Sequence, residues 1–295
     1  MGDPKFRRIQ RELKLHKPDP RLILPEPLIE FKRLVGSGCP VSDLFSATEQ
    51  LGRELKKELE KIGQLERDIR GAYNLMSAPD RAAFLSMIYS RFAENYDRHM
   101  GIETGHYQAM RFVLRYAHMV HRFGFPLLDV TAGTGELIRY AMELDNGNGL
   151  ICANDLSEKM LAKAKEKLGN GRVFFHNHDA CCFPDEWEGK FRTVLLSQTL
   201  NLLTDEDKIR LITSVKKVMD DGGKVIVIEE DPFGVTQTDA IQSVAMFIRG
   251  VGEPFANPGE LIGLFRPLGF TRYPEHAVAE IDGNHNMKVY IFMKK

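Results

Sequence analysis

The sequence predicts an α/β fold in which a doubly wound, mostly parallel sheet is followed by an antiparallel hairpin and preceded by a helical N-terminal extension. Three observations support this fold class. Short apolar runs alternate with amphipathic segments of helical spacing, which is the pattern of buried parallel strands connected by helices. A glycine turn joins the first run to the helix after it. Near the C-terminus, two further runs are separated by a turn sequence, which indicates a hairpin.

The first strand and its glycine turn are the most informative part of the chain. Leu127 to Val130 is apolar throughout, as expected of a strand covered on both faces, and apolar residues recur at helical spacing from Leu137. Gly133 and Gly135 lie between the strand and the helix, where residues without Cβ atoms adopt positive φ and let a ligand approach the backbone. The helix N-terminus presents unpaired N–H groups to such a ligand. The segment therefore predicts a nucleotide-cofactor pocket.

The spacing of the glycines separates two classes of cofactor. A dinucleotide fingerprint starting at Gly133 needs a third glycine at the position of Ile138, so that pattern is incomplete. The pattern present is Asp-x-x-x-Gly-x-Gly, beginning at Asp129. Taken alone, Asp129 is equally consistent with a strand-end acid that caps a turn.

The remaining elements follow in order, and acids stand at the ends of two strands. Asp155 ends the second strand, where a carboxylate can accept both hydroxyls of a ribose, and Ser157 is the expected N-cap of the next helix. Asp179 follows the third strand. The predicted strands cover residues 149–155, 172–175, 191–197 and 221–229, and the hairpin runs from Gly269–Thr271 to Lys288–Met293.

These motifs resemble those of the class I S-adenosylmethionine-dependent methyltransferases, and the specific matches lie between Leu127 and Asp179. The resemblance implies a Rossmann-like sheet of seven strands, S-adenosylmethionine as the cofactor and S-adenosylhomocysteine as its product. It implies that the glycine turn lies under the methionine portion, that Asp155 binds the ribose and that Asp179 binds the adenine amino group. The implied cofactor-binding residues are Asp129, Ala132, Gly133, Gly135, Asp155, Leu156, Met160, Asp179, Ala180 and Ser197.

One residue departs from the family pattern. The family usually has glycine at the position of Thr131, and a β-branched residue there predicts a slightly different turn. This departure leaves open a third interpretation beside the enzymes, a non-catalytic partner or regulator that has kept the fold.

Two residues are the catalytic candidates. The tract Met87–Met100 resembles the helix before the core in methyltransferases of the ubiquinone and menaquinone C-methyltransferase type, where a Tyr-Asp pair sits over the cofactor. The resemblance implies that Tyr96 is a lid residue, although an aromatic that packs a helix onto the sheet explains it as well. His106 is the first candidate base because the pKa of histidine is closest to working pH. Its rivals are His99, Tyr107, Glu229, Glu230 and Asp231.

The acceptor is expected to be a small organic or lipid-like metabolite. The segment Ser197–Asn201 lacks the Asn/Asp-Pro-Pro-aromatic cluster of methyltransferases that act on amino groups of nucleic-acid bases, so DNA is not expected as a partner. Residues 231–260 are long enough for an acceptor lid, or for an extra helix packed on the core, and their large apolar side chains include Phe233, Met246, Phe247 and Phe255. The alternative within the enzyme class is a protein or RNA methyltransferase that docks through its N-terminal extension.

The division of the chain is predicted at residues 1–97 and 98–295. The extension contains a basic tail, a proline-rich connector and a long amphipathic helix from Ser42 to about Arg70, whose apolar stripe needs a cover. Either the protein's own domain or a second copy, in a homodimer, would supply it. The tail is either a solvated segment or a weak arm for polyanions.

Composition adds limits. The formal net charge is −1 over 295 residues, and the sequence shows neither a signal peptide nor an apolar run of membrane-spanning length, so a cytoplasmic protein is expected. The four cysteines have no paired C-x-x-C spacing. His176, His178 and the cysteines that follow resemble zinc ligands, but the adenine-loop role of Asp179 already explains that segment, and no metal is expected.

Overall fold

The computed structural model describes residues 74–98, 100–101, 106–145, 149–169, 171–231, 258–280 and 286–295. The basic tail, the proline-rich connector and the amphipathic helix lie outside these residues, as do His99 and most of the expected lid at 231–260. The homodimer and the acceptor lid therefore stay predictions.

The described residues form one seven-stranded sheet in the order β3-β2-β1-β4-β5-β7-β6. The first five strands in sequence run parallel to one another, whereas β7 runs antiparallel to both β5 and β6. This confirms the predicted mostly parallel sheet with a C-terminal hairpin. The strands are β1 (Leu127–Asp129), β2 (Ile151–Asn154), β3 (Val173–His176), β4 (Phe191–Ser197), β5 (Met219–Asp231), β6 (Phe270–Glu280) and β7 (Asn286–Lys294).

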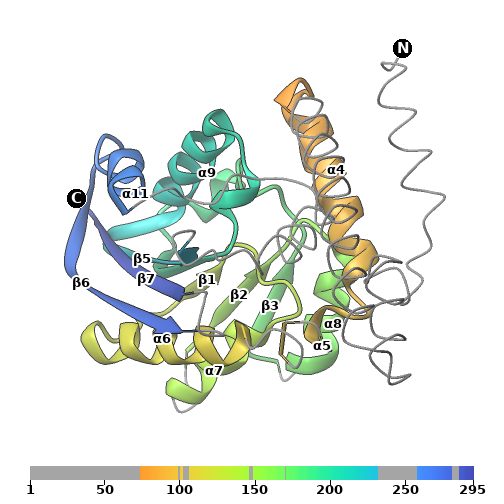
Figure 1. The fold of residues 1–295 in the computed structure, drawn as a ribbon, viewed down its shortest axis with the longest axis horizontal. Helices are drawn as coiled ribbons and strands as arrows, with labels where there is room; N and C mark the ends of the chain where they lie inside the picture. The colour runs from red at the N-terminus through yellow and green to blue at the C-terminus, as the bar shows by residue number, and fades with distance from the viewer. Residues whose placement is uncertain are drawn as a thin grey trace, which may run out of the picture. The chain divides into compact units, whose positions relative to one another are not determined.

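Helices cover both faces of the sheet because successive strand residues point to opposite sides. Leu127 belongs to the apolar cluster shared with α6 (His106–Val120) and α7 (Glu136–Leu144), whereas Leu128 belongs to the cluster shared with α9 (Asp205–Val218) and α11 (Pro258–Phe265). Figure 1 shows α6 and α7 on one side of the sheet and α9 and α11 on the other. Two short 3-10 helices, η3 (Asp185–Trp187) and η4 (Leu200–Leu202), complete the connections described after β3 and β4. None of the helices in the described part is long and apolar enough to cross a membrane.

The strand order places a topological switch point between β1 and β4. The chain leaves β1 toward β2 and β3 on one side, and β4 lies on the other side of β1. Open α/β sheets bind their ligands at the carboxyl ends of the strands beside such a point. The turns after β1 and after β4 are therefore the expected ligand site.

Helix α4 (Ala78–Phe92) is fastened to the sheet domain at both of its ends. It begins at the N-cap Ser77, whose hydroxyl accepts the Asp80 N–H. Near this end the Arg81 guanidinium forms a buried bidentate pair with the Asp207 carboxylate at the start of α9.

Contacts group residues 76–239 and 251–295 into one compact unit, and the predicted boundary at residues 97 and 98 stays a prediction.

Gly135 is expected to be essential for folding, for two reasons. Its φ is +82°, and a Cβ atom on it would lie 2.5 Å from Leu168 Cδ1 and 3.1 Å from Ala164 Cβ on α8 (Glu158–Leu168). Gly135→Ala should lower the free energy of unfolding in urea by about 2–4 kcal/mol, through the left-handed backbone and the overpacked contact. Gly171→Ala is the control, because its φ is +79° but no heavy atom of the described residues lies within 4 Å of the added Cβ. It should lose only about 1–2 kcal/mol. Equal losses in the two variants would contradict this account of the packing.

Candidate functional site

The turn after β1 is fastened to the end of β2 by backbone hydrogen bonds. The Ala132 N–H donates to the Asn154 carbonyl at 2.7 Å, and the Gly133 N–H donates to Asp155 Oδ2 at 2.8 Å. Gly133 adopts a φ of +53°, the left-handed conformation that glycine tolerates best. The predicted cofactor residues on these two strands are therefore in direct contact.

The space over Gly133 is bounded by Tyr96. Among the described residues, a Cβ atom built on Gly133 would meet one heavy atom within 4 Å, Tyr96 Cε1 at 3.9 Å. Gly135 is confined by α8, whereas Gly133 faces outward beneath the Tyr96 ring. This position is what a lid residue would occupy, and the lid role of Tyr96 stays a prediction.

Asp129 is buried at the end of β1 with an incomplete set of hydrogen bonds. Its Oδ1 accepts the Thr131 N–H at 3.3 Å, and among the described residues its buried Oδ2 has no hydrogen-bond partner. Burial raises the pKa of this carboxyl to about 7, against the Thr131 N–H, which lowers it, and with a smaller contribution from the charge of Asp155. A buried acceptor without a partner is costly, and a ligand that brings a positively charged donor would satisfy it.

Asp155 follows β2 with both carboxylate oxygens turned to the backbone. Oδ2 accepts the Gly133 N–H, and Oδ1 accepts the Ser157 N–H at 2.8 Å. Burial raises the pKa of Asp155 to about 6, although these N–H groups oppose the shift. Because each carboxylate oxygen has two lone pairs, both oxygens can still accept a hydroxyl group. Ser157 caps α8 by accepting the Met160 N–H at 3.3 Å, which leaves Met160 buried in the first turn of the helix.

Asn154 organises the site, and the sequence prediction did not include it. Its Nδ2 donates to the carbonyls of Val130 at 3.0 Å and His178 at 3.1 Å, and its Oδ1 accepts the His178 N–H at 3.0 Å. One buried amide thus ties together the chain segments that follow β1, β2 and β3. A polar residue at the last position of an otherwise apolar strand was the available signal.

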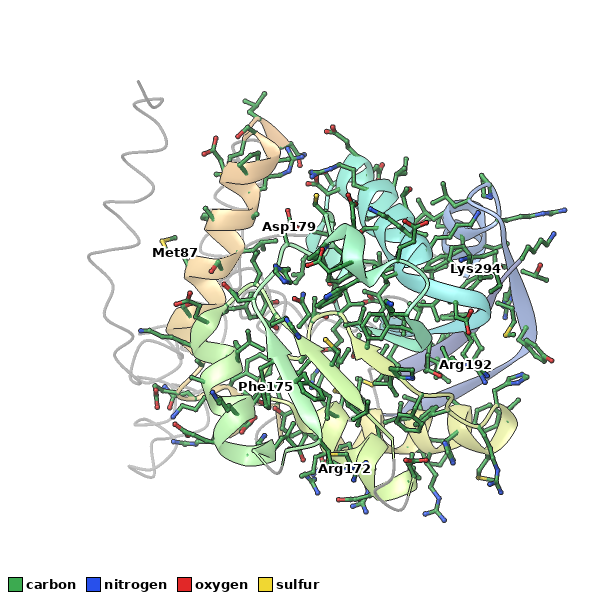
Figure 2. All side chains as sticks on the ribbon, turned by 180° about the vertical axis from the view of Figure 1, so that it is seen from behind. Met87, Arg172, Phe175, Asp179, Arg192 and Lys294 are labelled. Atoms are coloured by element: carbon green, nitrogen blue, oxygen red, sulfur yellow. The ribbon has the colours of Figure 1, made fainter. Side chains whose placement is uncertain are left out.

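Asp179 lies beyond the carboxyl end of β3, as Figure 2 shows, with Arg172 at the opposite end of the strand. Its Oδ1 accepts the Cys181 N–H at 2.9 Å, and its carbonyl accepts the Cys182 N–H at 2.9 Å. These bonds make a tight turn in which Ala180 packs against the apolar cluster beneath it. Asp179 thus lies at the same edge of the sheet as Asp155.

Helix α4 contacts the segment that follows β2. The Ser86 hydroxyl donates to the Leu156 carbonyl at 3.0 Å, and the Ser90 and Ser157 hydroxyls are 2.8 Å apart. The sequence prediction assigned these serines to the N-terminal extension, with no role in the site. The contacts place α4 directly beside the predicted ribose-binding segment.

The short helix α5 (Tyr96–Arg98) is held to the glycine turn by a polar network around Asp97. The carboxylate of Asp97 accepts the Tyr107 hydroxyl at 2.6 Å and the Thr134 hydroxyl, and it pairs with Lys167 Nζ at 2.9 Å. Burial acts to raise the pKa of Asp97, but the hydrogen bonds from Thr134, Tyr107 and Lys167 outweigh it and hold the pKa below its usual value. The charged form of Asp97 therefore fixes the position of Tyr96.

Three of the candidate bases, His106, Tyr107 and Glu229, are buried, and they differ in the hydrogen bonds that they make. His106 is buried at the first position of α6, and its role stays a prediction. Burial raises the pKa of the neighbouring Tyr107 well above its usual value, with further contributions from Tyr96 and Asp97, so Tyr107 is a neutral donor in the Asp97 network. Glu229 is buried, and its Oε1 accepts two backbone N–H groups, from Thr199 and Leu200.

The segment after β4 contains further unsatisfied polar atoms. Ser197 Oγ and Asn201 Oδ1 are buried, and neither has a hydrogen-bond partner within the part of the chain that the structure describes. Between them, Gln198 adopts a φ of 49°, an uncommon conformation for a residue with a side chain. Unsatisfied groups and backbone strain concentrate at functional sites.

The histidines that resembled zinc ligands stack on each other. The rings of His176 and His178 lie 5.8 Å apart, and the edges of both meet Trp187. Over the described ranges, no group of three or more His, Cys, Asp or Glu side chains is arranged to hold a metal ion.

The residues at this edge fit S-adenosylmethionine. Asp129 Oδ2 is an acceptor that needs a donor, the turn over Gly133 has room for a ligand, and Asp155 has free lone pairs for two hydroxyls. The family model described as "Methyltransferase domain" matches residues 127–223, which contain all three.

Curated relatives agree with this match. The ubiquinone/menaquinone biosynthesis C-methyltransferase UbiE of Shewanella sediminis is 27% identical over 180 residues, which cover 58% of this chain and 68% of the relative. The protein of the same name from Escherichia coli O1:K1 is 32% identical over 114 residues, 37% of this chain and 43% of the relative.

Solved structures share the fold. The magnesium protoporphyrin IX methyltransferase ChlM of Synechocystis, with bound S-adenosylhomocysteine, has a TM-score of 0.56 at 17% identity, with 73% of this chain and all of that chain covered. The 1,6-didemethyltoxoflavin-N1-methyltransferase of Burkholderia thailandensis has a TM-score of 0.55 at 18% identity, with 75% and 92% of the two chains covered. The motifs, the methyltransferase-domain match over residues 127–223 and the curated relatives together support a class I S-adenosylmethionine-dependent methyltransferase of the small-molecule type, and the solved structures share its fold.

Proposed function

We propose that the protein transfers the methyl group of S-adenosylmethionine to a small organic or lipid-like metabolite. The observation that carries this proposal is the covering of the glycine turn and the β2 segment by α4 and α5. Ser86 and Ser90 on α4 bond to the segment after β2, and Tyr96 on α5 lies over Gly133. A site walled by helices of its own chain suits a small acceptor better than a segment of a macromolecule.

Different residues of the chain would bind different parts of the cofactor. When bound, S-adenosylmethionine supplies a methyl group on a positively charged sulfur that is a good leaving group. Asp129 would accept the ammonium group of the methionine portion, Asp155 the ribose hydroxyls and Asp179 the adenine amino group. Ala132, Gly133, Gly135, Leu156, Met160, Ala180 and Ser197 would form the rest of the cofactor site.

Catalysis would then depend mainly on positioning. Holding two reactants in line can supply about 7–11 kcal/mol in favourable cases. If the acceptor atom carries a proton, a base adds about 10²–10⁴ in rate, and His106 is the candidate for that role. Tyr96 would close the site over the cofactor and hold the acceptor against it.

The binding of cofactor product is the first test. Titration calorimetry of the full chain with S-adenosylhomocysteine should give a saturable site, and Asp155→Ala should raise its Kd about 100-fold through the loss of two charge-assisted hydrogen bonds. Asp221→Ala is the control, because this exposed acid at the start of β5 lies at the opposite end of the strands. The cofactor assignment is wrong if the two variants bind equally well.

The pH dependence of binding tests the role of Asp129. The ligand-free carboxyl has its pKa raised to about 7, so lowering the pH below 7 protonates it and removes the charge that an ammonium group needs. The affinity for S-adenosylhomocysteine should therefore fall with decreasing pH, approaching about tenfold per unit below 7. Asp129→Asn should bind weakly and lose this dependence between pH 6 and 7. The same variant should melt at a higher temperature than the parent above pH 7, since the parent buries a charge there. Affinity that stays constant from pH 5.5 to 8 in the parent would rule out Asp129 as the ammonium site.

The acceptor class needs a direct experiment. The chain would be incubated with methyl-labelled S-adenosylmethionine and either a metabolite extract, total protein or total RNA. Label in an organic small molecule supports the proposal. Label in protein or RNA would replace it with the docking function of the N-terminal extension, and binding without any labelled product would indicate a non-catalytic protein.

A further inference from the structure

A hydroxyl pair joins the turn after β1 to the turn after β4. Thr131 Oγ1 and Thr199 Oγ1 are 2.6 Å apart, across the switch point between the two strands. Thr199 Oγ1 also lies 2.9 Å from the Ser197 carbonyl, which can only accept. Thr131 Oγ1 lies farther from this carbonyl, at 3.5 Å. Because each hydroxyl has one proton and the carbonyl is nearer to Thr199, the arrangement with the shorter bonds has Thr199 donating to Ser197 and Thr131 donating to Thr199. This chain of donors depends on a hydroxyl at position 131.

Thr131 also holds the cofactor side of the site. Its N–H donates to Asp129 Oδ1, the only hydrogen bond that the described residues give to this carboxylate. The orientation of Asp129, and with it the direction of Oδ2, thus depends on where Thr131 lies. The Thr131 side chain is held by Thr199, and the Thr131 backbone N–H in turn holds the Asp129 carboxylate.

The turn after β4 is held rigidly from the other side. The Gln198 N–H donates to the Ile228 carbonyl at 2.8 Å, and the Thr199 and Leu200 N–H groups donate to Glu229 Oε1 at 3.1 and 3.0 Å. Three successive N–H groups are therefore bound by β5, and this binding holds Gln198 in its left-handed conformation. Thr131, which donates to Thr199, is therefore bonded to a turn that is itself held in place by β5.

The polar atoms beside these two turns call for a ligand. Asp129 Oδ2, Ser197 Oγ and Asn201 Oδ1 are all buried, and no partner within the described ranges satisfies any of them. Each such group costs about 1–3 kcal/mol when left unsatisfied. One lies at the end of β1 and two lie on either side of Gln198, so the pair Thr131–Thr199 connects the segments that carry them.

We propose that Thr131 is a positioning residue for the cofactor, and that its hydrogen bond to Thr199 locks the cofactor turn to the turn after β4. The inference rests on the proposed function, because it takes S-adenosylmethionine as the ligand of Asp129. It gives the residue that departs from the family glycine a task of its own in this chain.

A double-mutant cycle tests the coupling. Thr131→Val and Thr199→Val keep the shape of the side chain and remove the hydroxyl. Each should raise the Kd for S-adenosylhomocysteine about fivefold, the range expected of one hydrogen bond. The double variant should also show about a fivefold loss, because either single substitution already breaks the bond between the two turns. The bond from Thr199 to the Ser197 carbonyl, which Thr199→Val also removes, lies within the turn after β4 and does not connect it to Asp129. Thr131→Ser should bind within about twofold of the parent. Thr213→Val, an exposed threonine on α9, is the control and should have no effect.

Hydrogen exchange supplies a readout that does not depend on binding. In the ligand-free Thr131→Val variant, the amides of Thr199 and Leu200 should exchange faster than in the parent, and Thr131→Ser should restore them. Losses of affinity that multiply to about 25-fold in the double variant, or unchanged exchange in the β4 turn, would overturn the inference alone. A parent chain that fails to bind S-adenosylhomocysteine would overturn the proposed function and the inference together.

Discussion

The buried carboxylate of Asp129 governs the arrangement at the carboxyl edge of the sheet. It lies at the end of the central strand β1, its Oδ1 is held by the Thr131 N–H, and burial raises its pKa to about 7. Keeping a polar group there costs folding free energy that apolar packing would not cost. A ligand with a charged donor would offset that cost, and the neighbouring Gly133 lies beneath the Tyr96 ring of α5.

The site is assembled by side chains that tie separate segments together. Asn154 joins the ends of β1, β2 and β3, Asp97 joins α5 to the glycine turn, and the Arg81–Asp207 pair fixes α4 to α9. Desolvation offsets much of the attraction in such a buried ion pair, but removing one partner would leave the other charge buried and unpaired. The outcome is a candidate cofactor site with α4 and α5 as part of its wall.

Much of the fold followed from the sequence because it rests on local patterns. The fourth strand was predicted at residues 191–197, where the structure has it, and the final hairpin pairs as the turn signal indicated. Contacts between distant segments were not predictable in this way. Periodicity says nothing about which hydroxyl meets Thr131, and Asp97 bonds to Thr134 only because two helices and a turn converge. Thr131 was expected to alter the turn, but its bond to Thr199 needed the structure.

The central claim is that the edge between β1, β2 and β4 binds S-adenosylmethionine through Asp129 and Asp155. A crystal structure of the full chain with S-adenosylhomocysteine tests it most directly. The amino group of the ligand should lie on Asp129 Oδ2, the ribose hydroxyls on the Asp155 carboxylate and the adenine beside Asp179. A ligand bound elsewhere, or one that leaves Asp129 Oδ2 without a donor, would contradict it.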